Sequence, residues 1–188
     1  SNGYTLNSAG GFTNDSPTTY VSWTFRKAPK FFDIVTLTKT SGVETFSHSL
    51  NTDVGMILLK RLDDAWDWYV FHRGMDSSAP QDYSMRLNNT SARADASTHW
   101  NDTAPTSSIF TIGGGIPAGN YVAYLFGDNS SEDAADRLIS CGSYSGNGST
   151  NHITLGFEPQ WLLVKCSSNS STHWQIYDKM RGVTNGDN

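Results

Sequence analysis

MILLKRLDDAWDWYVFHRGM, residues 56–75, is the segment from which the architecture of this chain is inferred. Two apolar runs, Ile57–Leu59 and Trp68–Phe71, lie on either side of a polar turn. Aliphatic, β-branched and aromatic residues that flank a turn are typical of a β-hairpin. The boundary residues Gly55 and Gly74 disfavour the alternative, which is a helix. The sequence therefore predicts two antiparallel strands here.

A second version of this hairpin follows about a hundred residues further along the chain. Trp161–Cys166 reads WLLVKC, and Trp174–Asp178 reads WQIYD after a turn of Ser and Asn. Four pairs of residues align: Lys60 with Lys165, Trp68 with Trp174, Val70 with Ile176 and Phe71 with Tyr177. The repetition predicts a tandem repeat with a period of about 100 residues.

Segments upstream of the hairpins also match and set the domain bounds. Phe12-Thr13 followed by Tyr20–Phe25 is similar to Phe110-Thr111 followed by Tyr121–Phe126. We therefore divide the chain into four parts: the end of a preceding repeat or a closing strand (1–30), a complete repeat (31–126), an acidic linker (127–136) and the start of a second repeat (137–188). Two explanations stay open. Either the chain is cut from a longer array, which the polar residues after its last strand favour, or its two ends pair and close a second unit.

The remaining chain alternates between short strand patterns and turns of Gly, Asn and Ser. Further strands are predicted at 19–25, 31–38, 43–50, 83–88, 108–112, 120–126, 138–144 and 151–155. No convincing long helix is found. The predicted fold class is all-β, an antiparallel β-sandwich of jelly-roll or immunoglobulin-like type. Its core is expected to include large aromatic residues, namely Trp68, Phe71, Tyr121, Trp161, Trp174 and Tyr177.

Composition and charge exclude several classes of protein. Aromatic residues make up 12% of the chain and charged residues only 16%, which is typical of a turn-rich extracellular or virion surface. The net charge is −5 and no basic run is present, so nucleic acid is not expected as a partner. No apolar run approaches the roughly 18 residues of a membrane helix, and no signal peptide pattern is found, so membrane insertion is not expected.

Cysteine and metal chemistry are not expected either. The two cysteines, Cys141 and Cys166, are too few for a disulfide scaffold and are interpreted as buried free thiols, with a bridge as the alternative if their strands pair. The histidines lack metal-ligand spacing. The acidic run 128–133 lacks the glycine of a calcium loop and is interpreted as a solvated linker. We therefore predict no cofactor and no metal site.

Candidate binding residues lie in two polar turns. Trp66 and Trp100 stand beside polar residues and are expected to be partly exposed, so each could stack on a sugar ring or lie in an interface. Their neighbours complete the candidate set: Asp63, Asp64 and Asn101. A glycosidase normally needs two carboxyl groups at a set separation. The chain has three glutamates, and none belongs to a repeated acidic motif, so we do not expect an enzyme.

Several motifs together carry a resemblance to a known family. They are Lys60-Arg61, WYVFHRG (68–74), WNDTAPTSSIFT (100–111), YVAYLF (121–126), GSYSGNG (142–148) and GFEPQWLLVK (156–165). Their order resembles a domain of uncharacterised function that recurs in tailed-phage proteins, especially those of marine and cyanobacterial phages. The first copy has Leu37–Gly42 in place of the GSYxGNG-type turn, which leaves the turn geometry there undefined.

The resemblance implies a virion structural or tail-fibre module that serves appendage assembly and host-surface adhesion. It implies copies of itself, as a homotrimer, and other virion proteins as partners, and it gives no catalytic residues. Assembly would take place in the host cytoplasm, and the mature virion would be extracellular. The alternative is a lectin-like domain that binds host glycan. One shallow pocket shared by Trp66 and Trp100 would favour the lectin, whereas their burial against a neighbouring chain would favour a structural role.

Overall fold

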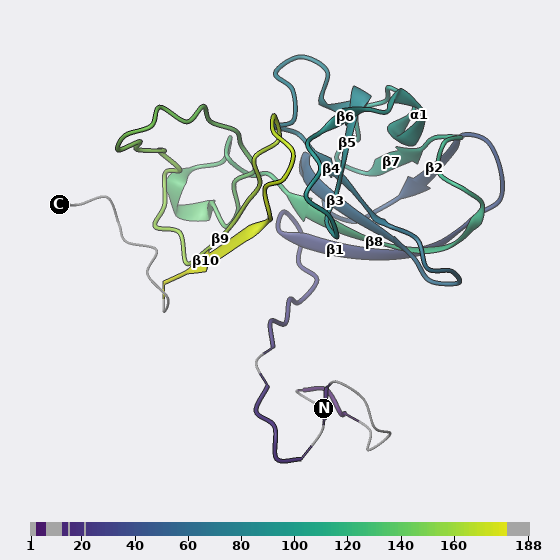
Figure 1. Cartoon of the computed structure of the whole chain (residues 1–188), viewed down its shortest axis with the longest axis horizontal. Coiled ribbons are helices and arrows are strands. Elements are labelled where there is room, and N and C mark those ends of the chain that lie inside the picture. Colours follow the sequence, from purple (N-terminus) through teal and green to yellow (C-terminus); the bar gives the residue numbers. More distant parts are fainter. Residues whose placement is uncertain (1–2, 7–12, 15, 21, 180–188) are drawn as a thin grey trace.

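The computed structural model describes residues 3–6, 13–14, 16–20 and 22–179. They form one domain that is mostly β and antiparallel, which confirms the predicted all-β class at this level (Figure 1). The main sheet has six strands in the order β1 (Phe32–Lys39), β8 (Gly119–Gly127), β3 (Val54–Arg61), β4 (Trp68–His72), β5 (Tyr83–Arg86) and β6 (Ala94–Asp95). The smaller elements are β2 (Glu44–Ser47), β7 (Ile109–Ile112), β9 (Trp161–Val164), β10 (Gln175–Asp178), α1 (Ser97–Trp100) and the 3-10 turns η1 (Pro80–Asp82) and η2 (Ala134–Asp136).

The predicted central hairpin is confirmed as β3 and β4, called the first hairpin below. Ile57 lies opposite Phe71, and Lys60 lies opposite Trp68. On its other edge β3 pairs with β8, which in turn pairs with β1. Residues 56–75 therefore supply most of two strands of the main sheet, and β3 has a strand on both sides.

The main core lies on one face of the six-stranded sheet, called the inner face. Side chains alternate along a strand, so Ile57 of β3 and Phe71 of β4 share this face. The pair formed by β2 and β7, together with α1, covers it (Figure 1). The rings of Phe71 and Trp100 meet edge to face with their centres 6.0 Å apart. Burying each such side chain stabilises the fold by about 1.5–3 kcal/mol.

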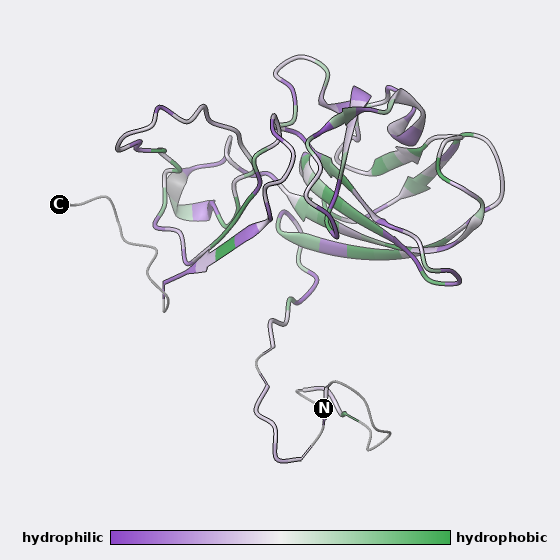
Figure 2. Cartoon of the chain, viewed as in Figure 1, coloured by the Kyte–Doolittle hydropathy of each residue, from purple (hydrophilic) through white to green (hydrophobic). Residues whose placement is uncertain are grey.

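The opposite, outer face of the sheet is also apolar. Phe32 and Ile34 of β1 share it with Leu58 and Tyr124, and Figure 2 shows hydrophobic residues along these long strands. Tyr124 stacks on both Phe32 and Trp68, at ring-centre distances of 6.4 and 6.1 Å. The sheet therefore has apolar side chains on both faces. The residues before β1 and the part of the chain after β8 cover the outer face only in part, and a groove remains there.

The predicted second hairpin forms as β9 and β10. Leu162 lies opposite Tyr177, which is the same register as Ile57 and Phe71 at the aligned positions of the first hairpin. Trp174 donates a hydrogen bond from its indole nitrogen to the carbonyl oxygen of Arg86 at 2.9 Å, which attaches the second hairpin to the main sheet.

The rest of the predicted second repeat does not form strands. The expected strands at 138–144 and 151–155 are irregular backbone, and the described residues of 19–25 form no strand. The run from 142 to 151 is dominated by Gly, Ser and Asn, which favour turns and offer little apolar surface to bury. The structure therefore has one layered unit and one additional hairpin, and a tandem repeat is not shown. The matches at Phe12 and residues 181–188 lie outside the described residues.

Candidate functional site

The turn of the first hairpin holds the two candidate aspartates. Arg61 donates from Nε to Asp63 Oδ1 at 2.6 Å, and the backbone N–H of Asn120 donates to Asp63 Oδ2 at 2.9 Å. These contacts, the Arg61 hydrogen bond first, lower the pKa of Asp63. Both oxygens of Asp63 therefore already have partners within the chain, and its role in this state is to fix the turn against β8.

Trp66 is the exposed aromatic residue of this turn, with 42% of its surface accessible. Its indole nitrogen donates to Asp64 Oδ2 at 3.0 Å, and the Arg61 guanidinium lies 5.9 Å from its ring centre. Lys60 Nζ donates to the carbonyl oxygen of Trp66 at 2.6 Å. An exposed ring held in place by three side chains is available for contact with another molecule.

Trp100 was expected to be partly exposed, and this prediction is wrong. Only 1% of its surface is accessible. The short helix α1 ends at Asn101, whose left-handed conformation (φ 55°) reverses the chain and leaves Trp100 against Phe71 in the core. The polar neighbours that suggested exposure belong to this surface turn. Because Trp100 is buried, it cannot form one shallow pocket with Trp66.

The predicted core residues divide between the two hairpins. Phe71 and Tyr121 are buried in the main core, and Trp68 and Trp174 are half-buried. Trp161 and Tyr177, which were expected in the core, are exposed. Tyr177 lies with Leu162 on the inner face of the second hairpin, and no counterpart of β2, β7 and α1 covers this face within the described part of the chain. Trp161 lies on the opposite face of the hairpin, where its ring contacts Phe25.

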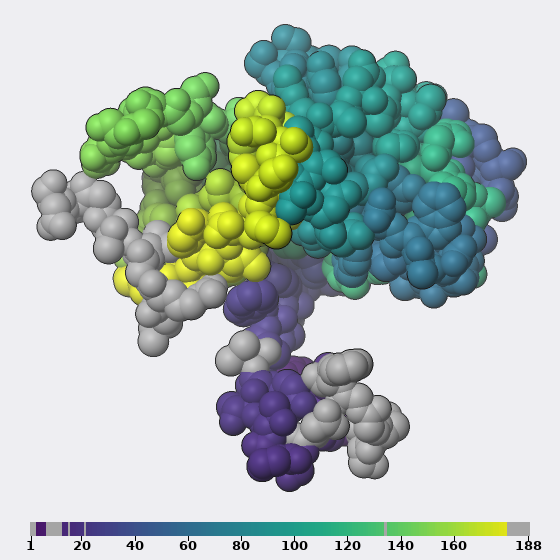
Figure 3. All heavy atoms as spheres, viewed as in Figure 1, coloured from purple at the N-terminus to yellow at the C-terminus, as the bar shows by residue number. Residues whose placement is uncertain are grey.

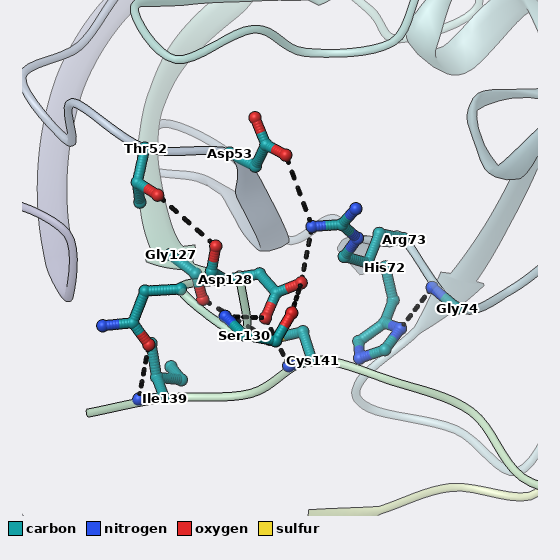
Figure 4. Close-up of polar contacts among 11 residues, drawn as sticks. Thr52, Asp53, His72, Arg73, Gly74, Gly127, Asp128, Ser130, Ile139 and Cys141 are labelled. Carbon is teal, nitrogen blue, oxygen red and sulfur yellow. Dashed lines mark hydrogen bonds and ion pairs between the residues drawn. The ribbon is translucent and has the colours of Figure 1, made fainter. Parts of the chain in front are cut away.

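A buried polar network lies where the chain leaves β8 (Figure 4). Asp128 Oδ2 accepts from Arg73 Nη1 at 2.5 Å and from Ser130 Oγ at 3.1 Å. Asp128 Oδ1 accepts from the backbone N–H groups of Ser130 and Cys141, at 3.2 and 3.3 Å. A buried carboxylate needs such partners to offset the loss of hydration. Asp128 therefore anchors the following segment to the main sheet.

Asn129 completes the anchor. It is fully buried, and its Oδ1 accepts from the backbone N–H groups of Leu138 and Ile139 at 3.2 and 3.1 Å. Its Nδ2 donates to the carbonyl oxygen of Asp136 at 3.1 Å. The prediction of a solvated acidic linker is wrong for Asp128 and Asn129, because both side chains close the loop between β8 and residue 141 rather than face water.

The titratable groups beside this network are not set up for catalysis. Burial raises the pKa of the Cys141 thiol to about 12, so it stays protonated at neutral pH, and its sulfur lies 3.6 Å from the carbonyl oxygen of Gly127. Burial lowers the pKa of His72 to about 4, and its Nδ1 accepts from the backbone N–H of Gly74. A protonated thiol and a very weak base cannot act as nucleophile and general base. The second thiol, Cys166, is exposed, and both cysteines are free.

Two glycines allow the segment around Cys141 to pack closely against the first hairpin. A Cβ atom at Gly55 would lie 2.5 Å from the Cys141 sulfur, and one at Gly74 would lie 2.9 Å from the backbone of Gly142. The segment that contains Cys141 therefore lies directly on the start of β3 and on the turn after β4. The network and these contacts hold the two halves of the chain together.

An apolar groove of about 470 Å³ lies over the outer face of the main sheet. Its walls include exposed or half-buried aromatic and aliphatic side chains: Trp23, Phe25, Ile34, Leu58, Trp68 and Tyr124. The Lys27 side chain, the charged group at the groove, already pairs with Asp33 at 2.5 Å. Such walls offer few hydrogen-bonding groups to a sugar and suit apolar side chains of a protein instead.

The second hairpin carries exposed apolar side chains. Leu162 is 37% exposed and Tyr177 46% exposed, although their counterparts Ile57 and Phe71 are 1% and 2% exposed. Figure 3 shows this hairpin, in yellow, at the surface beside the main body. Other large apolar side chains in the same half of the chain are also exposed, namely Leu138, Tyr144 and Ile153. Adjacent exposed apolar side chains such as Leu162 and Tyr177 indicate an interaction surface.

The described residues contain no metal-binding cluster and no helix that could span a membrane. No three His, Cys, Asp or Glu side chains there gather closely enough to hold a metal ion. The helices formed by those same residues are all too short to span a bilayer.

Comparison with known proteins places the chain in a family. Residues 1–188 match the family described as Domain of unknown function (DUF7483), so the chain belongs to this family over its whole length. No curated protein and no solved structure matches it.

Proposed function

We propose that this member of the family is a non-enzymatic structural module of a phage virion, within a tail fibre or similar appendage that contacts the host surface. Its partners are copies of itself, in a homotrimer, and other virion proteins. The phage setting rests on the motif resemblance, and the uncovered inner face of the second hairpin is the observation that supports assembly.

Residues at aligned positions of the two hairpins indicate how assembly would be stabilised. Leu162 and Tyr177 occupy the register positions of Ile57 and Phe71, which are buried in the main core. Burying each large apolar side chain stabilises a contact by about 1.5–3 kcal/mol. A stable association must also offset the lost freedom of the partners, roughly 4–15 kcal/mol, so the hairpin needs its neighbouring apolar side chains as well. Several copies packed around one axis supply such an area.

We include the tandem repeat and the sandwich type of the first unit in this proposal. The second hairpin is a partial copy of the first unit within a tandem repeat, supported by the shared register of β9–β10 and β3–β4. The layered first unit is a β-sandwich of jelly-roll or immunoglobulin-like type. Strands that are irregular in the single chain, 138–144 and 151–155, gain their partners on assembly.

The experiment is the mass of the purified protein by light scattering. The expected mass is a multiple of 20.6 kDa, and three times that mass for the trimer. The double variant Leu162→Ser/Tyr177→Ser is expected to lower the mass to that of a single chain. Leu62→Ser is the matched control, because Leu62 is exposed in the turn of the first hairpin and should leave the mass unchanged. A wild-type chain that stays at 20.6 kDa at every concentration would contradict the proposal.

A second candidate is glycan binding at the turn of the first hairpin. Trp66 supports it, because its exposed ring is held by Asp64 and could stack on the C–H face of a sugar. Trp66→Ala should then abolish binding on a glycan array, whereas Leu62→Ala beside it should not. Equal binding by both variants, or no binding by the wild type, would remove this candidate.

A further inference from the structure

The edge of β9 is open. In the first hairpin, β3 pairs with β4 on one side and with β8 on the other. In the second hairpin, β9 pairs with β10 alone among the described residues. A strand with an unpaired edge presents free N–H and C=O groups and accepts a further strand readily. The position that is vacant beside β9 is the one that β8 fills beside β3.

The chain carries a second sequence of the β8 type. YVSWTF, residues 20–25, aligns with YVAYLF, residues 121–126, and both end in an aromatic-rich alternation. In β8, Phe126 lies opposite Met56, and Leu125 lies opposite Ile57. Transferred to the aligned positions, this register places Phe25 opposite Trp161 and Thr24 opposite Leu162.

Within one chain, this segment already lies close to β9. The rings of Phe25 and Trp161 meet edge to face with their centres 6.5 Å apart. Trp23 and Phe25 would lie on the same face of the added strand, as Tyr124 and Phe126 do in β8. Both are exposed, so pairing would bury surface that the single chain leaves in water.

The segment does not complete β9 within its own chain. Ala28 forms a bridge with Phe32, and Lys27 is bound to Asp33 and to the carbonyl oxygen of Ile34, which fixes the end of the segment to β1. Residues 22–27 form no strand, and the described residues 16–20 lie away from the main body (Figure 1). In one copy, residues 22–25 and the free edge of β9 therefore have no strand pairing with each other, although the Phe25 ring packs on Phe126 and Trp161.

We propose that residues 22–25 of a second copy add to the free edge of β9 as an antiparallel strand, with Phe25 opposite Trp161. This inference rests on the proposed assembly and names its contact. The interface is heterologous, because each copy gives a strand on one side and accepts one on the other. Main-chain hydrogen bonds provide affinity, and the alternating Trp23 and Phe25 side chains select the register.

The test is disulfide trapping between two variants in a Cys166→Ser background. Cys141 is kept, because it is half-buried and burial raises the pKa of its thiol to about 12, so little thiolate is present during the oxidation. One preparation carries Thr24→Cys and the other Leu162→Cys. After mixing and mild oxidation, a cross-linked species of about twice 20.6 kDa is expected. The matched control pairs Thr24→Cys with Leu163→Cys, whose side chain is on the opposite face of β9 and should cross-link several-fold less.

The outcomes separate this inference from the proposed function. A cross-link between the two preparations supports the exchanged strand. A disulfide that forms only within a chain carrying both substitutions would overturn it, because the strand would then belong to the same copy. A particle that assembles by light scattering without any cross-link would overturn the inference and leave the proposed assembly in place. A single-chain mass without a cross-link would overturn both.

A second measurement covers the case of variants that do not fold. A synthetic peptide of residues 19–27 is added in excess to the wild-type protein. Slower exchange of the β9 amide hydrogens is expected, and a scrambled peptide of the same composition serves as the control. Equal exchange with both peptides would contradict the proposed pairing.

Discussion

The first and second hairpins are close to identical in pattern and register, and they differ in what covers them. Ile57 and Phe71 meet across β3 and β4 as Leu162 and Tyr177 meet across β9 and β10. The first pair is buried under α1 and the β2–β7 sheet, whereas the second pair is exposed. Local sequence therefore sets strand pairing in both places, and the surrounding elements decide which pair becomes core.

Phe71 and Tyr177 occupy aligned positions, and their substitution should change the stability of the protein by very different amounts. Phe71→Ala should lower the free energy of unfolding by about 3–5 kcal/mol, because it removes a buried ring beside Trp100. Tyr177→Ala in dilute protein should cost less than about 1 kcal/mol, because its ring is largely in water. Urea unfolding of both variants checks this. Equal losses would show that the second hairpin is covered in solution.

The next effect concerns the anchor between the two halves. Asp128→Ala should cost about 2–4 kcal/mol, because it leaves two backbone N–H groups without their acceptor and leaves Arg73 with the more distant Asp53, 3.7 Å away. The amide hydrogens of Ser130 and Cys141 should exchange faster. Asp136→Ala is the control, because its carboxylate is exposed. Unchanged exchange at Cys141 would show that the anchor does not hold this segment.

Acid should weaken the first unit through two histidines. Burial lowers the pKa of His72 and of His99 to about 4, below the ordinary value of about 6.5. The unfolded chain therefore binds these protons first, so the stability they contribute is full above pH 6.5 and declines as the pH falls toward 4. A loss of about 1–3 kcal/mol is expected in urea unfolding over this range.

The double variant His72→Gln/His99→Gln tests the source of that loss. It should flatten the dependence of unfolding free energy on pH between 6.5 and 4. His173→Gln is a suitable control, because His173 is an exposed histidine of the second half. An unchanged slope in the double variant would assign the acid sensitivity to other groups.

Substitution of Trp174 should have the smallest effect on stability. Trp174→Phe removes the hydrogen bond to the Arg86 carbonyl and should cost about 1 kcal/mol. Faster amide exchange in β9 and β10 should accompany the loss, while β3 stays protected. Trp161→Phe is the matched control in the dilute protein, where its ring is exposed. Equal effects of the two substitutions would contradict a specific role of the Trp174 bond.

The alternation of apolar residues and the residue types of the turns correctly predicted the strands of both hairpins. Both hairpins follow from alternating apolar runs around polar turns, and their shared register follows from the alignment. The predicted strands 138–144 and 151–155 did not form, because the residues between and at their ends (142–151) are mainly Gly, Ser and Asn, which favour turns, and no partner strand lies beside them among the described residues. A local match to a repeat does not by itself form a repeat.

The candidate site was harder to predict, because burial is decided by distant segments. Trp100 has polar neighbours, but the reversal at Asn101 places it in the core. Asp128 and Asn129 read as part of an acidic linker, but their partners at Arg73 and Ile139 are brought close only by the fold. The adjacent Gly127-Asp128-Asn129, directly after a strand, is the available signal for such an anchor.

The most direct test of the account is amide hydrogen exchange of the two hairpins as a function of protein concentration. We predict that the amide hydrogens of β3 and β4 are protected at every concentration. Those of β9 and β10 should exchange rapidly in dilute protein and slowly once copies assemble. Equal protection of both hairpins at a concentration where light scattering gives 20.6 kDa would contradict this prediction, because the cover of the second hairpin would then come from its own chain.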